Sequence, residues 1–112
     1  MSSCHDIIKL SEYDNIALVI ASFGNRLAED LWDDKSSRTV RRFPPELRRA
    51  ARRKLFYLND AEQLKDLRAP PGNRLEALKG NWSDYHSIRI NNQWRIVFRW
   101  ENGQALDVKV LD

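Results

Sequence analysis

Two runs of alternating residues, 85–90 and 94–100, constrain the fold of this 112-residue chain more than any other feature. In each run every second side chain lies on the same side, as in a β-strand, and a short polar segment joins the two runs. The pattern predicts a β-hairpin. One of its faces suits a hydrophobic core, because it carries His86, Ile88, Ile90, Trp94, Ile96, Phe98 and Trp100.

The opposite face of the predicted hairpin carries arginines. Arg89 and Arg95 flank the turn, and on paired strands they project toward the same face. Arg99 shares that face, although its neighbours Trp100 and Glu101 also suit an ordinary cross-strand pair. Arginines fixed on a sheet hold an anionic substrate at set distances, as catalysis on phosphate esters requires.

The remaining chain predicts helices first and strands last. We expect a strand over residues 16–23, a short helix over 26–34, and the clearest helix from Pro44-Pro45 onward, with an apolar stripe of Leu47, Ala51, Leu55 and Leu58. A turn over 69–73, where Gly72 can supply a positive φ, precedes a strand over 74–79.

Asn102-Gly103 then predicts a second hairpin turn, followed by a strand over 105–111 with Leu106, Val108 and Val110 facing one way. The fold class is therefore α+β, with N-terminal helices packed on one face of a small twisted antiparallel β-sheet.

Charge is distributed unevenly along the chain. Residues 1–37 carry a net charge of −4 and residues 38–112 a net charge of +7. Eight basic residues fall within positions 38–54, opposed only by Glu46. This basic segment suits a solvated helix face, a track along a nucleic-acid backbone, or a dock for an acidic protein, and the sequence leaves these three alternatives open.

Other classes of protein fit the sequence poorly. The length suits one domain, with residues 1–18 as an extension of low order. A single cysteine fits a reducing cytoplasm, and the longest apolar run, residues 16–21, is far too short to span a membrane. The pair Cys4-His5 has no second ligand cluster, so we expect neither a metal site nor a cofactor.

The chain contains no Gly-rich phosphate loop and no nucleophile elbow. The candidates for chemistry are basic and polar side chains on the predicted sheet: Arg74, Lys79, His86, Arg89, Arg95 and Arg99. RNA cleavage without metal requires a base for the 2′-hydroxyl proton, cations for the phosphate and an acid for the leaving oxygen. His86 lies in register with Ile88 and Ile90, which favours a position at the edge of the core over a catalytic role.

Three segments resemble a known family. The runs Val-Arg-Arg-Phe-Pro-Pro-Glu over 40–46, Leu-Arg-Ala-Pro-Pro-Gly-Asn-Arg-Leu-Glu-Ala-Leu-Lys-Gly over 67–80, and the whole hairpin 85–100 look like the HigB ("proteic killer") branch of the RelE/ParE toxin superfamily. The resemblance covers about residues 19–112, so we expect a RelE/HigB-like toxin domain there and an additional segment over 1–18.

The resemblance implies a toxin of a type II toxin–antitoxin system, a metal-independent endoribonuclease that cleaves translated mRNA in the ribosomal A site. It also implies a cytoplasmic protein whose partners are the ribosome, mRNA and a helix-turn-helix (HigA-like) antitoxin, with operator DNA bound only through the antitoxin. By position, Lys79 matches a functional lysine and Arg95 a phosphate-binding arginine, while Arg89 and Asn91 match further RNA-contacting positions. The catalytic candidates are Lys79, Arg89, Arg95 and Asp112, and the RNA-binding candidates are Arg74, Asn91, Arg48, Arg49, Arg52 and Arg53.

One departure from the family pattern affects the expected chemistry. Members typically end in Asp-Tyr-His, and this sequence stops at Asp112. Two alternatives therefore stay open beside the ribonuclease. One is a ParE-like toxin that poisons DNA gyrase, and the other is a catalytically weakened module that binds RNA or the antitoxin.

Overall fold

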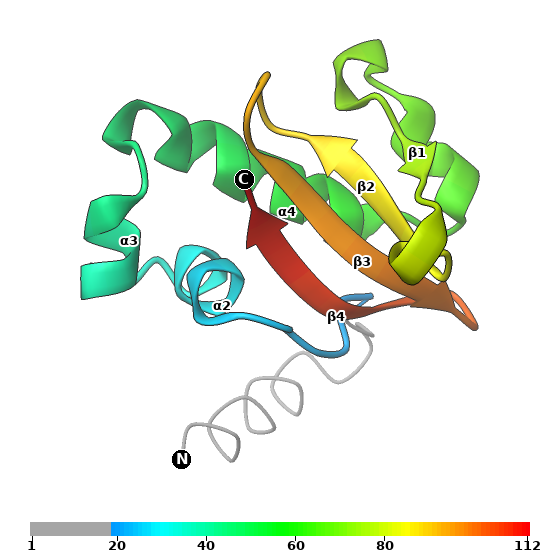
Figure 1. The fold of residues 1–112 in the computed structure, drawn as a ribbon, viewed down its shortest axis with the longest axis horizontal. Coiled ribbons are helices and arrows are strands. Elements are labelled where there is room, and N and C mark those ends of the chain that lie inside the picture. Colours follow the sequence, from blue (N-terminus) through cyan, green and yellow to red (C-terminus); the bar gives the residue numbers. More distant parts are fainter. Residues whose placement is uncertain (1–18) are drawn as a thin grey trace.

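The computed structural model describes residues 19–112, so the expectations for residues 1–18, including Cys4-His5, lie outside the described part. Helices come first and strands later in the chain (Figure 1). The α-helices are α2 (Arg26–Trp32), α3 (Arg38–Arg42) and α4 (Arg48–Asp60). Four short 3₁₀ segments, η1 to η4, span Pro45–Leu47, Leu64–Arg68, Pro71–Asn73 and Gly80–Trp82.

Four antiparallel strands form one sheet in the order β1-β2-β3-β4. They are β1 (Glu76–Ala77), β2 (Tyr85–Arg89), β3 (Arg95–Glu101) and β4 (Gln104–Leu111). Helix α4 lies behind the sheet in Figure 1, and α2 and α3 lie beyond the β4 edge. The α+β fold expected from the sequence is therefore confirmed.

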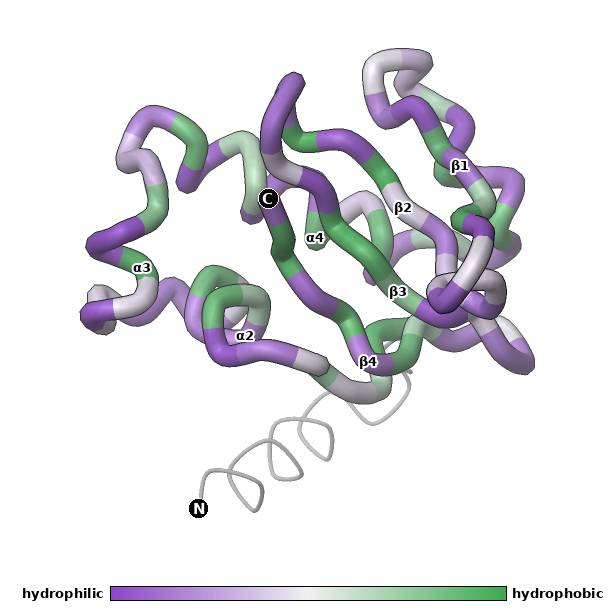
Figure 2. Tube along the Cα trace, in the orientation of Figure 1, coloured by the Kyte–Doolittle hydropathy of each residue, from purple (hydrophilic) through white to green (hydrophobic). Residues whose placement is uncertain are grey.

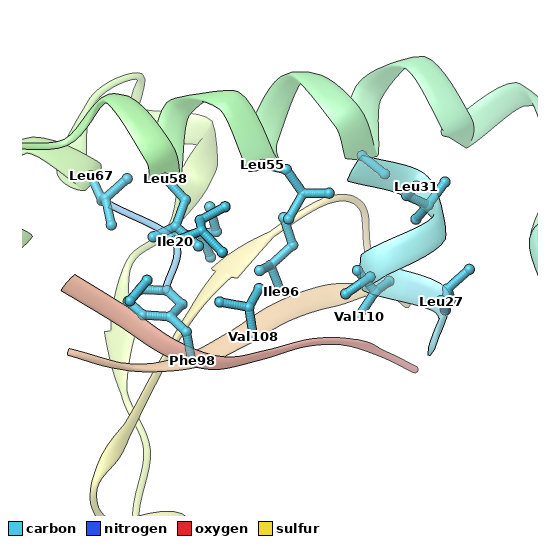
Figure 3. Close-up of a cluster of buried hydrophobic side chains, with 14 of the residues drawn as sticks. Ile20, Leu27, Leu31, Leu55, Leu58, Leu67, Ile96, Phe98, Val108 and Val110 are labelled. Carbon is cyan, nitrogen blue, oxygen red and sulfur yellow. The ribbon is translucent and has the colours of Figure 1, made fainter. Parts of the chain in front are cut away.

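The core lies between α4 and the inner face of the sheet (Figure 3). Leu55 and Leu58 of α4 meet Ile96 and Phe98 of β3, and all four side chains are fully buried. The apolar stripe predicted for this helix and the apolar face predicted for the hairpin are thus the two halves of one core. The second half of β4 alternates hydrophobic and hydrophilic residues, whereas the middle of β3 is continuously hydrophobic (Figure 2). The outer face therefore carries charged side chains from both strands around the buried Val97.

The last strand departs from simple alternation. Asp107 has a φ of +55°, and the pairing of β3 with β4 shifts register between Val97 and Arg99. This β-bulge moves Leu106 to the outer face, opposite Arg99, and leaves Ala105 in the core. The prediction that Leu106 shares a face with Val108 and Val110 is therefore wrong.

Several other boundaries also differ from the prediction. Residues 19–23 run parallel to β4 through two isolated bridges and form no full strand in the described part of the chain. The strand expected over 74–79 shrinks to β1, because Arg74 itself takes the left-handed conformation (φ +47°) that the sequence assigned to Gly72. Helix α3 was not predicted, and Ser37 caps it by accepting a hydrogen bond from the Val40 N–H.

One of the eight basic residues in the basic segment is not on the surface. Lys54 is buried, and its Nζ donates a hydrogen bond to the Oδ1 of Asn73, which is fully buried. The Asn73 amide in turn donates to the backbone carbonyls of Leu67 and Ala69 at 3.1 and 3.2 Å. Burial lowers the pKa of the Lys54 ammonium, and the neighbouring charge of Arg53 adds to this effect. Lys54 therefore anchors the 67–73 loop to α4.

Across residues 19–112, no helix has both the length and the apolar character needed to span a membrane. The same residues contain no group of His, Cys, Asp and Glu side chains suited to a metal ion.

Candidate active site on the outer face of the sheet

Arg89 and Arg95 are direct cross-strand partners at the end of the β2–β3 hairpin. Residues so paired have Cβ atoms about 5 Å apart on the same face, as the sequence predicted for this pair. Like charges in this arrangement repel each other, so the sheet bears an electrostatic cost at this position. Such a cost is common where side chains serve binding rather than stability.

A carboxylate partly offsets this repulsion. Arg95 Nη1 lies 2.6 Å from Glu76 Oε1 on β1 and 3.2 Å from the hydroxyl oxygen of Ser87 on β2. Both members of the ion pair are about half exposed, at 43% and 53%, so water weakens their attraction. Both contacts use Nη1, which leaves Arg95 Nε and Nη2 without a partner among the described residues.

The turn between β2 and β3 fixes the other arginine. Arg89 Nε donates to the Asn91 carbonyl at 3.1 Å, and both terminal nitrogens of Arg89 have no partner in residues 19–112. The Asn91 side chain accepts from the backbone N–H groups of Gln93 and Trp94 at 2.8 and 2.7 Å. Asn91 therefore holds the turn through its own Oδ1.

Asp112 lies at the same end of the sheet. Its Oδ2 accepts a hydrogen bond from Gln93 Nε2 at 2.8 Å, and the preceding Leu111 pairs with Arg95. We call the group Arg89, Asn91, Arg95 and Asp112 the arginine end of the outer face.

Lys79 lies away from the arginine end. Lys79 follows β1 and precedes η4, next to the start of β2, and within the described chain its side chain makes no hydrogen bond or ion pair. Arg74 is exposed at the end of η3. The structure thus brings Arg89, Asn91, Arg95 and Asp112 together and leaves Lys79 outside that group. Arg74, two residues before Glu76, lies toward the Arg89 end of the sheet, but its side chain makes no hydrogen bond or ion pair within residues 19–112.

A second cluster occupies the opposite end of the same face. Trp82 of η4 meets Tyr85 edge-on with ring centroids 4.9 Å apart, and Lys109 Nζ lies 4.9 Å from the Trp82 ring centroid. The Tyr85 hydroxyl donates to the Asp107 carboxylate, and Lys109 Nζ is 3.4 Å from that carboxylate. We call these four residues the aromatic end.

The hydrogen bond between Tyr85 and Asp107 separates their pKa values. It is the main reason that the pKa of the Tyr85 hydroxyl is raised and that of the Asp107 carboxyl is lowered. With these shifts in pKa, the Tyr85 phenol stays neutral and the Asp107 carboxylate stays ionised near neutral pH. Neither group is therefore suited to transfer a proton in catalysis at that pH.

His86 faces the core side of β2, as its register predicted. Its ring stacks on Phe98 with centroids 6.1 Å apart, and its buried Nδ1 has no hydrogen-bond partner among the described residues. Burial lowers the pKa of His86, because the charged imidazolium is poorly solvated there.

The arginines of α4 belong to a different surface. Arg49 and Arg53 are exposed on the side of the helix opposite the buried Ala51 and Leu55, so they point away from the sheet. Arg52 has a structural role, since its guanidinium donates to the Leu31 carbonyl at 2.8 Å. A surface pocket of about 460 Å³ is lined by Asp34, Arg48, Arg49, Arg52, Arg53, Phe56, Tyr57 and Asp60. These arginines therefore cannot share one site with Arg89 and Arg95.

Comparison with known proteins identifies the family. The profile described as "RelE-like toxin of type II toxin-antitoxin system HigB" matches residues 21–112. The chain belongs to the HigB toxin family. It is 45% identical to Toxin HigB-1 of Vibrio cholerae serotype O1 over 75 residues, which cover 67% of this chain and 76% of that protein. It is also 36% identical over 67 residues to an uncharacterized protein of Haemophilus influenzae, covering 60% of this chain and 66% of that protein.

As a HigB toxin of a type II toxin–antitoxin system, the protein has an antitoxin as its partner. The sequence predicts this family but does not single out four residues of the outer face: Glu76, Trp82, Asp107 and Lys109. The sequence signal for Glu76 was its place two residues after Arg74 in the predicted strand. The sequence gives no local signal for a bulge at Asp107. Aspartate is common in turns next to strands and also on exposed faces, so its presence here does not indicate which of the two it occupies.

Proposed function

We propose that this HigB toxin is a ribosome-dependent endoribonuclease that cleaves translated mRNA at the arginine end of the outer face. The observation that carries the proposal is the direct cross-strand pairing of Arg89 with Arg95, whose guanidinium groups retain unpartnered nitrogens within the described residues. Two guanidinium forks on one rigid hairpin suit the oxygens of a single phosphate.

The chemistry assigns a role to each candidate. Arg89 and Arg95 stabilise the charge that builds up on the phosphate as the 2′-oxygen attacks it. The Asp112 carboxylate, held by Gln93, accepts the 2′-hydroxyl proton as the 2′-oxygen bonds to phosphorus. The bond from phosphorus to the 5′-oxygen then breaks, and the protonated Asp112 carboxyl or a solvent water gives a proton to that leaving oxygen. Glu76 orients Arg95 through the 2.6 Å ion pair, and Lys79 adds positive charge for the RNA strand outside this group.

The exposed arginines of α4, Arg49 and Arg53, form a second basic surface, the α4 surface, on the side of the helix away from the sheet. Its exposed arginines dock the toxin on ribosomal RNA by contacting phosphates, which fixes the toxin without reading sequence. Asn91 and Arg74 contact the mRNA strand on either side of the cleaved link. The antitoxin of this system is a helix-turn-helix protein of the HigA type, and operator DNA is bound only through it.

Replacing Arg95 tests the proposal. We expect Arg95→Ala to slow mRNA cleavage on translating ribosomes by about 10²- to 10³-fold, the usual cost of removing one charge-stabilising donor, and to relieve growth arrest. Arg95→Lys should restore only part of the rate, because an ammonium lacks the planar fork. Single-turnover cleavage assays and growth after induction at equal expression measure both effects.

A control is Lys65→Ala. Lys65 is an exposed cation on η2, outside both ends of the outer face. We expect its loss to leave cleavage near the wild-type rate. If Arg95→Ala, with its thermal transition unchanged, remained as toxic as the wild type, the proposal would be wrong.

The gyrase-poisoning alternative predicts a different first effect in the cell. An endoribonuclease acting on translated mRNA stops incorporation of labelled amino acids before that of labelled thymidine. A ParE-like toxin reverses this order, so pulse labelling during the first minutes of induction separates the two functions.

A further inference from the structure

Trp82 is an exposed aromatic side chain that neither the core nor the arginine end explains. It is 38% exposed, and among the described residues only Phe56 is a more exposed large hydrophobic side chain. It ends the one-turn segment η4, which starts at Gly80 with a φ of +68° and whose ribbon lies in front of the strands in Figure 1.

The contacts around Trp82 hold its ring in place. Tyr85 packs edge-on against it, and Lys109 Nζ lies over both rings, 4.9 Å from the centroid of Trp82 and 5.6 Å from that of Tyr85. Asp107 fixes Lys109 and accepts the Tyr85 hydroxyl proton in a hydrogen bond. The two rings therefore form a fixed platform with a cation over it.

The platform shares a face with the proposed cleavage site. Tyr85 and Arg89 point to the same side of β2 and are four residues apart, so the two ends of the outer face are separated by about 13 Å. Lys79, exposed and directly before η4, adds positive charge beside the platform. A short single-stranded segment can contact both ends at once.

A fixed aromatic surface bordered by cations suits a nucleobase attached to a phosphate chain. Base stacking on aromatic side chains tolerates every base, since each has a π face, and basic neighbours follow the backbone. An acidic peptide would use the cations but not the platform. We propose that Trp82 stacks on a base of the mRNA that flanks the cleaved link, with Tyr85 and Lys109 supporting its ring. This inference rests on the proposed ribonuclease function.

The role proposed for Trp82 is to position the strand. Stacking on Trp82 fixes which phosphate reaches Arg89 and Arg95, and it contributes affinity rather than base identity. Alanine substitution of a stacking aromatic side chain usually weakens binding of one base by about 5- to 150-fold.

A coupling experiment tests the contact between Trp82 and a base. Ribosomes are programmed with mRNAs in which one nucleotide at a time around the cleaved link lacks its base, and kcat/KM is measured for the wild type, Trp82→Ala and Trp82→Phe. At one flanking position we expect the missing base to slow the wild type by about 5- to 150-fold. At that position Trp82→Ala should be insensitive, and Trp82→Phe should keep most of the sensitivity because it retains a ring.

A structural role for Trp82 would lower the rate equally for every mRNA and would give no coupling at any position. That result would overturn the inference but would not contradict the proposed ribonuclease function. The same holds if Trp82→Ala weakens only the capture of the antitoxin. If the wild type cleaves no mRNA on translating ribosomes, the proposed function itself is contradicted and the inference fails with it.

Discussion

The buried side chain of Asn73 connects Lys54 of α4 to the backbone of the loop that precedes it. It accepts from the Lys54 ammonium and donates to two carbonyls of the preceding loop, and all of its polar atoms are buried. A buried cation that loses its acceptor retains its desolvation cost without compensation.

We therefore expect Asn73→Ala to lower the free energy of unfolding by about 2–3 kcal/mol, measured by urea denaturation. Adding Lys54→Met to this variant should recover part of the loss, because the unpaired ammonium is then gone. Strictly additive effects of the two substitutions would show that the contact is not energetically coupled.

His86 predicts a pH dependence of stability. Its pKa in the folded protein is below the unfolded value of 6.5 because burial disfavours the imidazolium. As the pH falls below 6.5, the unfolded chain takes up a proton at His86 that the folded protein resists, so stability decreases.

Thermal melts of the wild type and His86→Gln across this range measure the effect. The stability of the wild type relative to the variant should be constant above pH 6.5 and should fall below it. A constant difference across the whole range would contradict the burial of the ring.

Among the elements, α2 and β4 are joined through one side chain. Asn25 caps α2 by accepting from the Ala28 N–H at 3.0 Å, and the same side chain exchanges two hydrogen bonds with the backbone of Val110 at 2.9 and 3.3 Å. The N-cap of the first described helix thus also fixes the last strand.

We expect Asn25→Ala to cost about 2 kcal/mol of unfolding free energy, since both the cap and the Val110 contacts are lost. Asn25→Ser is the matched control, because serine caps a helix well but is too short to replace the amide at Val110. It should recover about half of the loss in urea denaturation, and equal stability of the two variants would contradict the joint role.

The bulge in β4 is the element that forms the aromatic end. It turns Asp107 onto the outer face beside Tyr85 and Lys109 while Val108 and Val110 stay in the core. A shift of one residue moves every side chain of a strand to the opposite face. Without the extra residue, β4 could therefore not place Leu106 on the outer face and still keep Val108 and Val110 in the core.

At the scale of the whole molecule, two basic surfaces lie on opposite sides of the core. The arginines of the outer face serve the proposed chemistry, and Arg49 and Arg53 on α4 lie on the far side of the helix layer. This separation allows binding to the ribosome and cleavage of the RNA to be changed independently.

We expect Arg49→Glu with Arg53→Glu to weaken binding to ribosomes and to reduce the slope of log affinity against log salt by about two, one for each lost phosphate contact. Arg95→Ala should leave both quantities unchanged. Sedimentation binding at several salt concentrations measures this difference. Normal ribosome binding combined with lost antitoxin capture would instead assign the α4 surface to the antitoxin.

The sequence by itself determined the features that depend on neighbours along the chain. Alternation over residues 85–100 gave the hairpin and placed Arg89 opposite Arg95, and the spacing of Ala51, Leu55 and Leu58 gave the buried side of α4. These patterns can be recognised in the sequence because side chains repeat every two residues in a strand and every 3.6 residues in a helix, independently of tertiary contacts.

Only the tertiary structure decided which distant residues meet. The burial of Lys54 against Asn73, the ion pair of Arg95 with Glu76, and the position of Trp82 beside Tyr85 and Lys109 join residues from different elements. The bulge at Asp107 also escaped prediction, because Leu106, Val108 and Val110 alternate with Asp107 and Lys109 as they would in a regular strand. Such contacts depend on strand register and on packing against the helix. The periodicity of residues along the chain specifies neither of these.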